Sequence, residues 1–210
     1  MKKTILDIVY ILYNNYNKCL CSIEGLVKLF KNSNINFTVH IHDNSFTINK
    51  QELINKFIND IKSLSSPLIQ INYYPSDKNI GFGSGCNNAV NKGSHETIAI
   101  VNCDTSFLKT DVNTFKTVAS LCNYKNPIIG PKILTIEGLI HSSCFSFDPI
   151  SIALKPLRHA RYIGSFSKYI PEYKSIKTRI DRITYEGLSK NEPSYVDWVS
   201  GCFMFVNRKF

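Results

Sequence analysis

The sequence lacks the local patterns that identify the commonest small metal and phosphate sites. Its seven cysteines are scattered, with no Cys-x-x-Cys pair and no cysteine and histidine set at zinc spacing, so they are predicted to be reduced thiols. A P-loop is absent, because Asn91-Lys92-Gly93-Ser94 has its letters in the wrong order. A dinucleotide fingerprint needs GxGxxG after the first strand, whereas the glycines at 81, 83 and 85 follow the third predicted strand.

Long apolar runs and acidic charge are both scarce. The apolar run at residues 4–13 is interrupted by Asp7 and is too short to cross a bilayer or to form the core of a signal peptide, which predicts a soluble, cytoplasmic protein. Lys and Arg number 25 against 16 Asp and Glu, a formal net charge of +9. This excess leaves nucleic acid, anionic lipid and a phosphorylated substrate as candidate partners.

The first part of the chain alternates between two kinds of pattern. Strands are predicted at 5–13, 36–43 and 68–74, and helices at 19–31 and 49–64. This order predicts a mostly parallel sheet with right-handed crossovers and flanking helices, an α/β fold. The chain has 210 residues, 43% of them hydrophobic, which is enough for one full core and predicts a single domain over 1–210.

Two histidines lie two positions apart in the second predicted strand. His40 and His42 share a face of that strand, which is expected to face solvent. A metal site there is disfavoured, because no third ligand lies nearby in the sequence.

The stretch from Asn79 to Asp104 is predicted to form a loop, a helix and a strand, followed by an acidic tip at Asn102-Cys103-Asp104. The three glycines of the loop allow backbone conformations that other residues avoid, and the helix predicted over 86–91 could present its first N–H groups to an anion. A short apolar strand is predicted over 97–101. Asn102 and Asp104 then point the same way on an extended backbone, and their oxygens suit a hard divalent cation that also holds phosphates.

These parts, in this order, resemble the GT-A glycosyltransferases of family 2, and in particular their rhamnosyltransferase-like branch. That family has an Asn-x-Gly-Phe-Gly/Ala loop, a helix with an Asn, and a strand ending in Asn-Pro-Asp. The matching residues here are Asn79, Gly81, Phe82, Gly83, Asn87, Asn102 and Asp104. Cys103 stands where the family usually has proline, a change that leaves the metal-facing atoms untouched.

The resemblance implies a nucleotide-sugar-binding half over 1–104 and an acceptor-side half over 105–210. It places Tyr13 and Asn14 against the donor nucleotide, and it makes Asp43 the acceptor of a hydrogen bond from a uracil or thymine base, hence a UDP or dTDP donor. Asp104 would hold Mg²⁺ or Mn²⁺ on the donor diphosphate. Without the resemblance, Tyr13-Asn14 is a polar loop and Asp43 caps a turn.

The second half carries another match. Asp197, Trp198 and Gly201 occupy the family's Asp-Trp-x-x-Gly motif, which borders the donor sugar and the acceptor, and the strand is predicted over 195–206. Trp198 is either a sugar-stacking platform or a core residue. A helix is predicted over 112–122, a strand over 127–134 and a hairpin built on Glu137-Gly138 over 135–141.

Residues 155–182 are basic and interleaved with aromatic residues. They form either a solvated loop or a surface for a membrane interface or a pyrophosphate-bearing substrate, with nucleic acid as a further alternative. A membrane contact through this segment predicts a peripheral position on the inner membrane face.

The resemblance implies an inverting transfer of a hexose, rhamnose among the candidates, to a cell-surface polysaccharide or a lipid-linked glycan precursor. In the family the strand is followed by a segment with Gly-Gly-Phe-Asp-Glu and then a Glu-Asp pair, which holds the general base. Neither is found before Phe210, so the acceptor half is expected to be incomplete. Asp197 is the candidate substitute. The alternative functions are a non-catalytic nucleotide-sugar-binding domain and, with less support, a nucleic-acid-binding module.

Overall fold

The structure is a computed structural model, and it describes residues 5–33, 35–45, 51–107, 110–141, 143–145 and 193–210. The chain divides into two compact units, which are Met1–Pro131 with Gly201–Phe210, and Lys132–Ser200. These boundaries differ from the predicted division after residue 104, and the single domain over 1–210 stays a prediction.

The first unit is built on a six-stranded sheet with strand order β3-β2-β1-β4-β10-β5. Its strands are β1 (Ile5–Leu12), β2 (Asn36–Asp43), β3 (Ile69–Pro75), β4 (Thr97–Val101), β5 (Ile128–Ile129) and β10 (Phe203–Asn207). The four strands β1 to β4 are mutually parallel, whereas β10 runs antiparallel to both β4 and β5. The helices are α1 (Tyr16–Phe30), α2 (Gln51–Ser63), α3 (Phe82–Val90) and α4 (Val112–Leu121). The predicted α/β class, a mostly parallel sheet flanked by helices, is confirmed.

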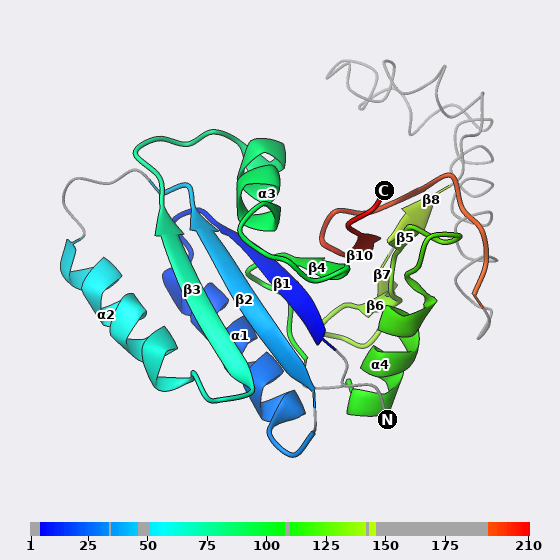
Figure 1. Cartoon of the computed structure of the whole chain (residues 1–210), viewed down its shortest axis with the longest axis horizontal. Coiled ribbons are helices and arrows are strands. Elements are labelled where there is room, and N and C mark those ends of the chain that lie inside the picture. Colours follow the sequence, from blue (N-terminus) through cyan, green and yellow to red (C-terminus); the bar gives the residue numbers. More distant parts are fainter. Residues whose placement is uncertain (1–4, 34, 46–50, 108–109, 142, 146–192) are drawn as a thin grey trace, which may run out of the picture. The chain divides into compact units, whose positions relative to one another are not determined.

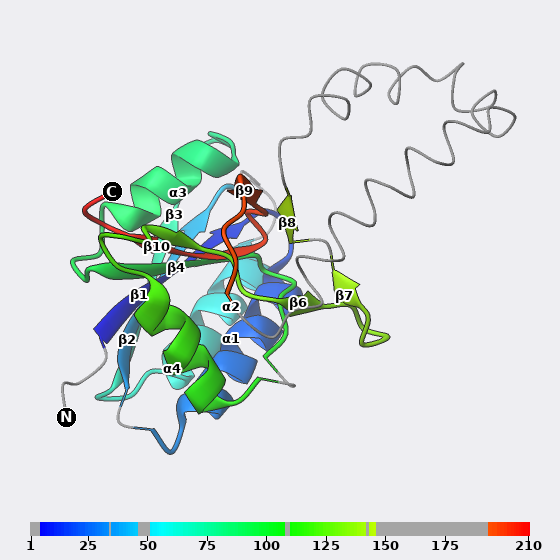
Figure 2. The same ribbon diagram turned by 90° about the vertical axis from the view of Figure 1, so that its right-hand side faces the viewer.

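The alternation of side chains along β1 explains how both faces of the sheet are covered. Tyr10 points toward α1, where its hydroxyl lies 3.0 Å from Ser22 Oγ. Val9 and Ile11 point to the opposite face and pack against Cys86 and Ala89 of α3. Figures 1 and 2 show α1 and α3 on opposite faces of the sheet.

An aromatic cluster joins α4 to the sheet on the face that α1 covers. The ring of Phe115 lies 5.0 Å from that of Phe30 and 5.2 Å from that of Phe205, both edge-on. Phe107 and Phe203 extend the cluster. Edge-on aromatic pairs stabilise a core beyond the area they bury, so this cluster packs α4 against α1 and β10.

The described residues of the second unit form two small antiparallel pairs. One is the hairpin of β6 (Ile133–Leu134) and β7 (Ile140–His141), and the other joins β8 (Cys144–Phe145) to β9 (Trp198–Val199). The hairpin turn uses Gly138 at a φ of 84°, and Gly138 N–H donates to the carbonyl of Thr135 over 2.9 Å. The predicted hairpin on Glu137-Gly138 is therefore confirmed.

Several predicted elements have different limits in the structure. The helix α1 begins at Tyr16, three residues before the predicted start, and α3 begins at Phe82. The strand predicted over 127–134 is two short strands, β5 and β6, and that over 195–206 is β9 and β10. The basic segment 155–182 lies outside the described residues.

The prediction that His40 and His42 face solvent is wrong. Both are buried, with 2% and 6% of their surface exposed, because α3 and the turn after it cover that face of β2. Burial lowers the pKa of His42, which favours its neutral form. All seven cysteines are free. In the described segments no helix is both long and apolar enough to cross a bilayer.

Candidate functional site

The site lies where the chain reverses its direction of progress across the sheet. From β1 the chain adds β2 and then β3 on one side, and it then returns to place β4 on the other side of β1. The carboxyl ends of β1 and β4 therefore flank a topological switch point, the place where open α/β sheets bind ligands. Asn14 follows β1 there, and Asn102 follows β4.

A turn at Gly81 brings the chain from β3 into α3. Gly81 is the residue that caps α3 and has a φ of 83°, a conformation that L side chains rarely adopt. Asn79 Oδ1 accepts from Gly81 N–H over 2.9 Å. Gly83 and Gly85 lie inside α3. The prediction that all three glycines adopt backbone conformations that other residues avoid therefore holds for Gly81 alone.

Asn44 ties this turn to the end of the sheet. Its Nδ2 donates to the carbonyl of Gly81 over 3.1 Å, and its Oδ1 accepts from Ile80 N–H over 3.4 Å. Its own backbone N–H donates to the carbonyl of Leu12 over 2.8 Å. Asn44 was not assigned a role from the sequence, although it directly follows Asp43, which was.

Gly85 allows α3 to approach the sheet closely. A Cβ at this position would lie 3.1 Å from His42 Cδ2 and 3.2 Å from both Asn44 Nδ2 and Ile11 Cγ2. These distances are shorter than ordinary van der Waals contacts, so a side chain here would push α3 outward. The first turn of α3 is thereby held against the carboxyl ends of β1 and β2.

The acidic tip follows β4 at the same edge. Asn102 N–H donates to the carbonyl of Cys202 over 2.9 Å, and Cys103 Sγ donates to the carbonyl of Ile11 over 3.3 Å. Cys103 and Asp104 lie in a turn in which Thr105 N–H donates to the carbonyl of Asn102 over 3.1 Å, so the expectation of an extended backbone here is wrong. Asp104 is exposed at the end of the tip. A Cβ at Gly201, next to Cys202, would lie 3.6 Å from Phe82 Cε1, so the first residue of α3 lies beside the segment that accepts the hydrogen bond from Asn102.

Asp43 is buried and already holds three protein hydrogen bonds. Its Oδ2 accepts from the hydroxyls of Tyr16 at 2.9 Å and Tyr73 at 2.5 Å, and its Oδ1 accepts from Ser45 N–H at 2.7 Å. Burial raises the pKa of Tyr16 to about 12, with the Asp43 carboxylate acting in the same direction, and the same two causes hold that of Tyr73 well above its usual range. Both phenols are therefore neutral donors at neutral pH. The bond to Ser45 is a turn cap, and base recognition by Asp43 stays a prediction.

The remaining residues that were predicted to belong to the site lie on different elements. Tyr13 and Asn14 are exposed after β1, where Asn14 has a φ of 55° and its N–H donates to Ser45 Oγ over 2.6 Å. Asn87 is exposed on α3. In the second unit, Asp197 and Trp198 are exposed, with Trp198 at 42%, so the alternative of Trp198 as a core residue is wrong.

Comparison with known proteins gives only distant structural likenesses. No protein family and no curated protein matches the sequence. A mannosyltransferase from Pyrobaculum calidifontis, solved with GDP-Man and Mn²⁺, matches with a TM-score of 0.45 and 12% identity over 61% of this chain and 35% of its own. Residues 1–349 of S. aureus TarS match with a TM-score of 0.42 and 18% identity over 57% of this chain and 32% of that one. The chain thus spans about a third of each of these structures.

The donor set at the tip suits a divalent cation that takes most of its ligands from a substrate. Among the described residues no group of three or more His, Cys, Asp or Glu side chains could hold a metal by itself. Asp104 supplies one exposed carboxylate and Asn102 one partly exposed amide. Mg²⁺ commonly binds through one or two carboxylates together with phosphate oxygens and waters, so these residues fit a metal that arrives with a diphosphate.

Proposed function

We propose that the protein is a glycosyltransferase that binds a nucleoside diphosphate sugar at the carboxyl edge of its sheet. One observation carries the proposal: the first turn of α3 lies against the carboxyl ends of β1 and β2, and Phe82 lies beside the Gly201-Cys202 segment that bonds the Asn102-Cys103-Asp104 tip at the switch point between β1 and β4. A helix N-terminus attracts an anion, and an exposed carboxylate beside it recruits a cation. A diphosphate bridged to a divalent metal satisfies both.

The diphosphate is bound by the start of α3 in this proposal. The first backbone N–H groups of a helix have no partner inside the helix, and here they belong to Phe82 and Gly83, both exposed. Asn79 and Asn87 add carboxamide donors on either side of that turn. Gly81 is needed because its conformation aims the helix start at the edge of the sheet.

Asp104 and Asn102 hold the metal in this proposal. When bound, Mg²⁺ or Mn²⁺ supplies positive charge that stabilises the leaving nucleoside diphosphate. Because Asp104 is exposed, its side chain can reach a ligand without movement of β4.

In this proposal the pyrimidine base of the nucleotide lies against Tyr13, Asn14 and Asp43. A carboxylate has about four lone-pair sites, so Asp43 retains one after its three protein hydrogen bonds. The imide N–H of uracil or thymine can donate to it, which favours UDP or dTDP donors.

The donor sugar is a hexose, with rhamnose among the candidates, and the acceptor is a cell-surface polysaccharide or a lipid-linked glycan precursor. Inversion at the anomeric carbon requires a base that takes the proton of the acceptor hydroxyl. Asp197 is the candidate for that role, and Trp198 and Gly201 are the candidates for sugar contacts. The protein would work in the cytoplasm, with residues 155–182 as the candidate contact to the inner membrane face.

The test is calorimetric titration with UDP, dTDP, GDP and ADP and with their sugar conjugates, each with and without Mn²⁺. Binding of a uridine or thymidine diphosphate that needs Mn²⁺ supports the proposal. Transfer and donor hydrolysis are then measured with the tightest donor. Metal-dependent binding without either reaction would identify a non-catalytic nucleotide-sugar-binding domain. The absence of nucleotide binding would refute both the glycosyltransferase and the binding domain.

A further inference from the structure

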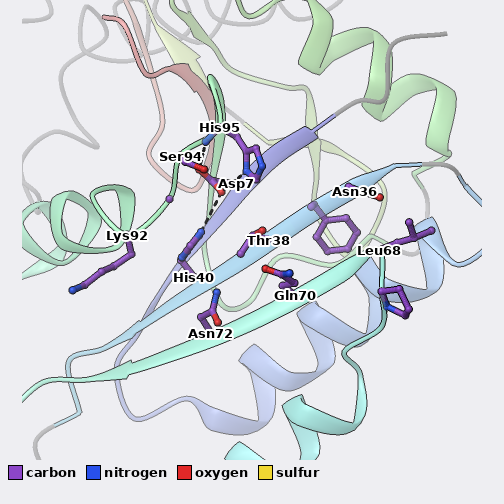
Figure 3. A pocket seen from close by; sticks show the side chains of 13 residues that line it. Asp7, Asn36, Thr38, His40, Leu68, Gln70, Asn72, Lys92, Ser94 and His95 are labelled. Atoms are coloured by element: carbon purple, nitrogen blue, oxygen red, sulfur yellow. Dashed lines mark hydrogen bonds and ion pairs between the residues drawn. The ribbon is translucent and has the colours of Figure 1, made fainter.

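A polar cavity lies on the sheet away from the candidate site. It has a volume of about 360 Å³, at the lower end of the range for small-ligand sites. Its walls come from the amino-terminal halves of β1, β2 and β3 and from the turn between α3 and β4, whereas the candidate site lies at the carboxyl ends of the strands. Figure 3 shows Thr38, Gln70 and Asn72 beside Asp7, His40 and His95.

Asp7 orients both histidines in this wall through hydrogen bonds to its carboxylate. Burial raises the pKa of Asp7, but hydrogen bonds from His40 and His95 outweigh it and hold the pKa well below its usual range. The carboxylate is therefore an acceptor, with Oδ1 3.1 Å from His40 Nε2 and 2.7 Å from His95 Nδ1. Those two nitrogens must donate, which leaves His95 Nε2 as an acceptor in the neutral ring.

A second acceptor on the wall has no protein partner. Among the described residues, the buried Asn36 Oδ1 makes no hydrogen bond. A buried carbonyl oxygen without a donor destabilises the fold, because the loss of its hydration is not compensated. Because this oxygen is shielded from solvent, a ligand hydroxyl would donate to it only after the Asn36 side chain turns toward the cavity.

The other lining groups both donate and accept. Gln70 and Asn72 present carboxamides, and Thr38 and Ser94 present hydroxyls. Leu68 and Pro67 add a small apolar border. The charge of Asp7 is balanced by Arg208, whose Nη2 donates to Asp7 Oδ2 over 2.7 Å.

We infer that this cavity is a second ligand site and that it binds a neutral saccharide. A sugar ring carries several hydroxyl groups that donate and accept, together with a less polar face that suits Leu68 and Pro67. A polyanionic ligand fits less well, because Lys92 is the one lysine or arginine among the lining residues. The site would hold a glycan while a nucleotide occupies the opposite ends of the strands.

The experiment is saturation-transfer difference NMR on the full chain, with methyl α-glucopyranoside, methyl α-mannopyranoside and N-acetylglucosamine as probes. Gln70→Leu/Asn72→Leu removes two amides from exposed or half-buried positions at a strand edge. Gln51→Leu is the matched control, because Gln51 is exposed on α2 and does not line the cavity. Thermal melting verifies that each variant is folded.

We expect at least one probe to bind, and we expect the double variant to weaken that binding roughly tenfold or more, as the loss of two hydrogen bonds predicts. Asn36→Leu should also weaken binding while leaving the melting temperature unchanged or raised, because it removes the orphan acceptor. The inference is overturned by no binding of any probe, by equal binding to the double variant, or by displacement of the sugar by UDP with Mn²⁺. The last result would assign the sugar to the nucleotide site, and nucleotide titration tests that site independently.

Discussion

Arg208 Nη2 donates to Asp7 Oδ2 over 2.7 Å and joins two residues 201 positions apart in the chain. The same guanidinium donates to the carbonyls of His95 and Val90, each over 2.7 Å. Asp7 is 1% exposed, and its carboxylate also accepts hydrogen bonds from His40 Nε2 and from the backbone N–H of His95. One buried carboxylate thus holds β1, β2, the turn before β4 and the segment after β10 together.

Asp7→Asn should destabilise the fold by about 1–3 kcal/mol, because hydrogen bonds to a charged group are lost and Arg208 keeps an unbalanced charge. Urea unfolding measures the difference. Lys209→Ala is the control: the ion pair of Lys209 with Glu96 spans 3.6 Å between side chains that are 70% and 58% exposed, and its loss should change stability by less than about 0.5 kcal/mol. Equal effects of the two variants would contradict the central role of Asp7.

The stability of the protein should fall in acid through the same carboxylate. The pKa of Asp7 is lower in the folded chain than its ordinary value of 3.8, so its contribution is fully present above about pH 5 and is lost as the pH falls below about 4. In Asp7→Asn the free energy of unfolding should therefore depend less on pH in this acidic range. Unfolding curves of both proteins between pH 3 and 7 measure it, and parallel slopes would show that other carboxylates dominate.

Three glycine substitutions separate the roles of the loop glycines. Gly85→Ala should destabilise by about 1–3 kcal/mol, because its Cβ would meet His42, Asn44 and Ile11 at 3.1–3.2 Å. Gly81→Ala should cost about 1–2 kcal/mol through its φ of 83°, although the space around it is open. Gly83→Ala has open space and a helical conformation, so it should stabilise by about 0.5–1 kcal/mol. A destabilised Gly83→Ala would show that the start of α3 differs from this description.

Asp104→Ala should abolish Mn²⁺-dependent binding of a nucleoside diphosphate and leave the melting temperature unchanged, because Asp104 is exposed. Calorimetric titration with UDP or dTDP and Mn²⁺ measures this loss. Asp60→Ala, on α2, removes a partly exposed carboxylate outside the candidate site and should bind as the parent does. Parent-like binding by Asp104→Ala would disprove the metal assignment.

The base preference tests Asp43. UDP or dTDP should bind roughly ten- to a hundredfold more tightly than ADP, the range expected for one hydrogen bond to a charged acceptor. Asp43→Asn should erase this difference, and melting must be followed in parallel because Tyr16 and Tyr73 also donate to this carboxylate. Equal affinity of the parent for all bases would exclude the role of Asp43 in recognition.

Local sequence patterns were sufficient for the order of the elements and for the turn at Gly81. The β-branched runs of β1 and β4, the helical spacing in α2 and the Glu137-Gly138 turn each act over a few residues, and each was predicted at or near its observed limits. The start of α3 was missed, because Gly83 and Gly85 resemble loop residues until their packing is known. Gly85 is helical because α3 must approach Ile11 and His42 closely.

The chain by itself determined the parallel α/β order and the acidic tip after β4, since these depend on periodicity and on adjacent residues. Only the tertiary structure decided that His40 and His42 are buried, that Asn44 anchors the Gly81 turn and that Asp7 meets Arg208. Strand alternation states which residues share a face, but it does not state which face a distant helix will cover. Contacts between residues far apart in sequence settle that choice, and the cavity beside Asp7 exists because β3 and the turn before β4 meet there.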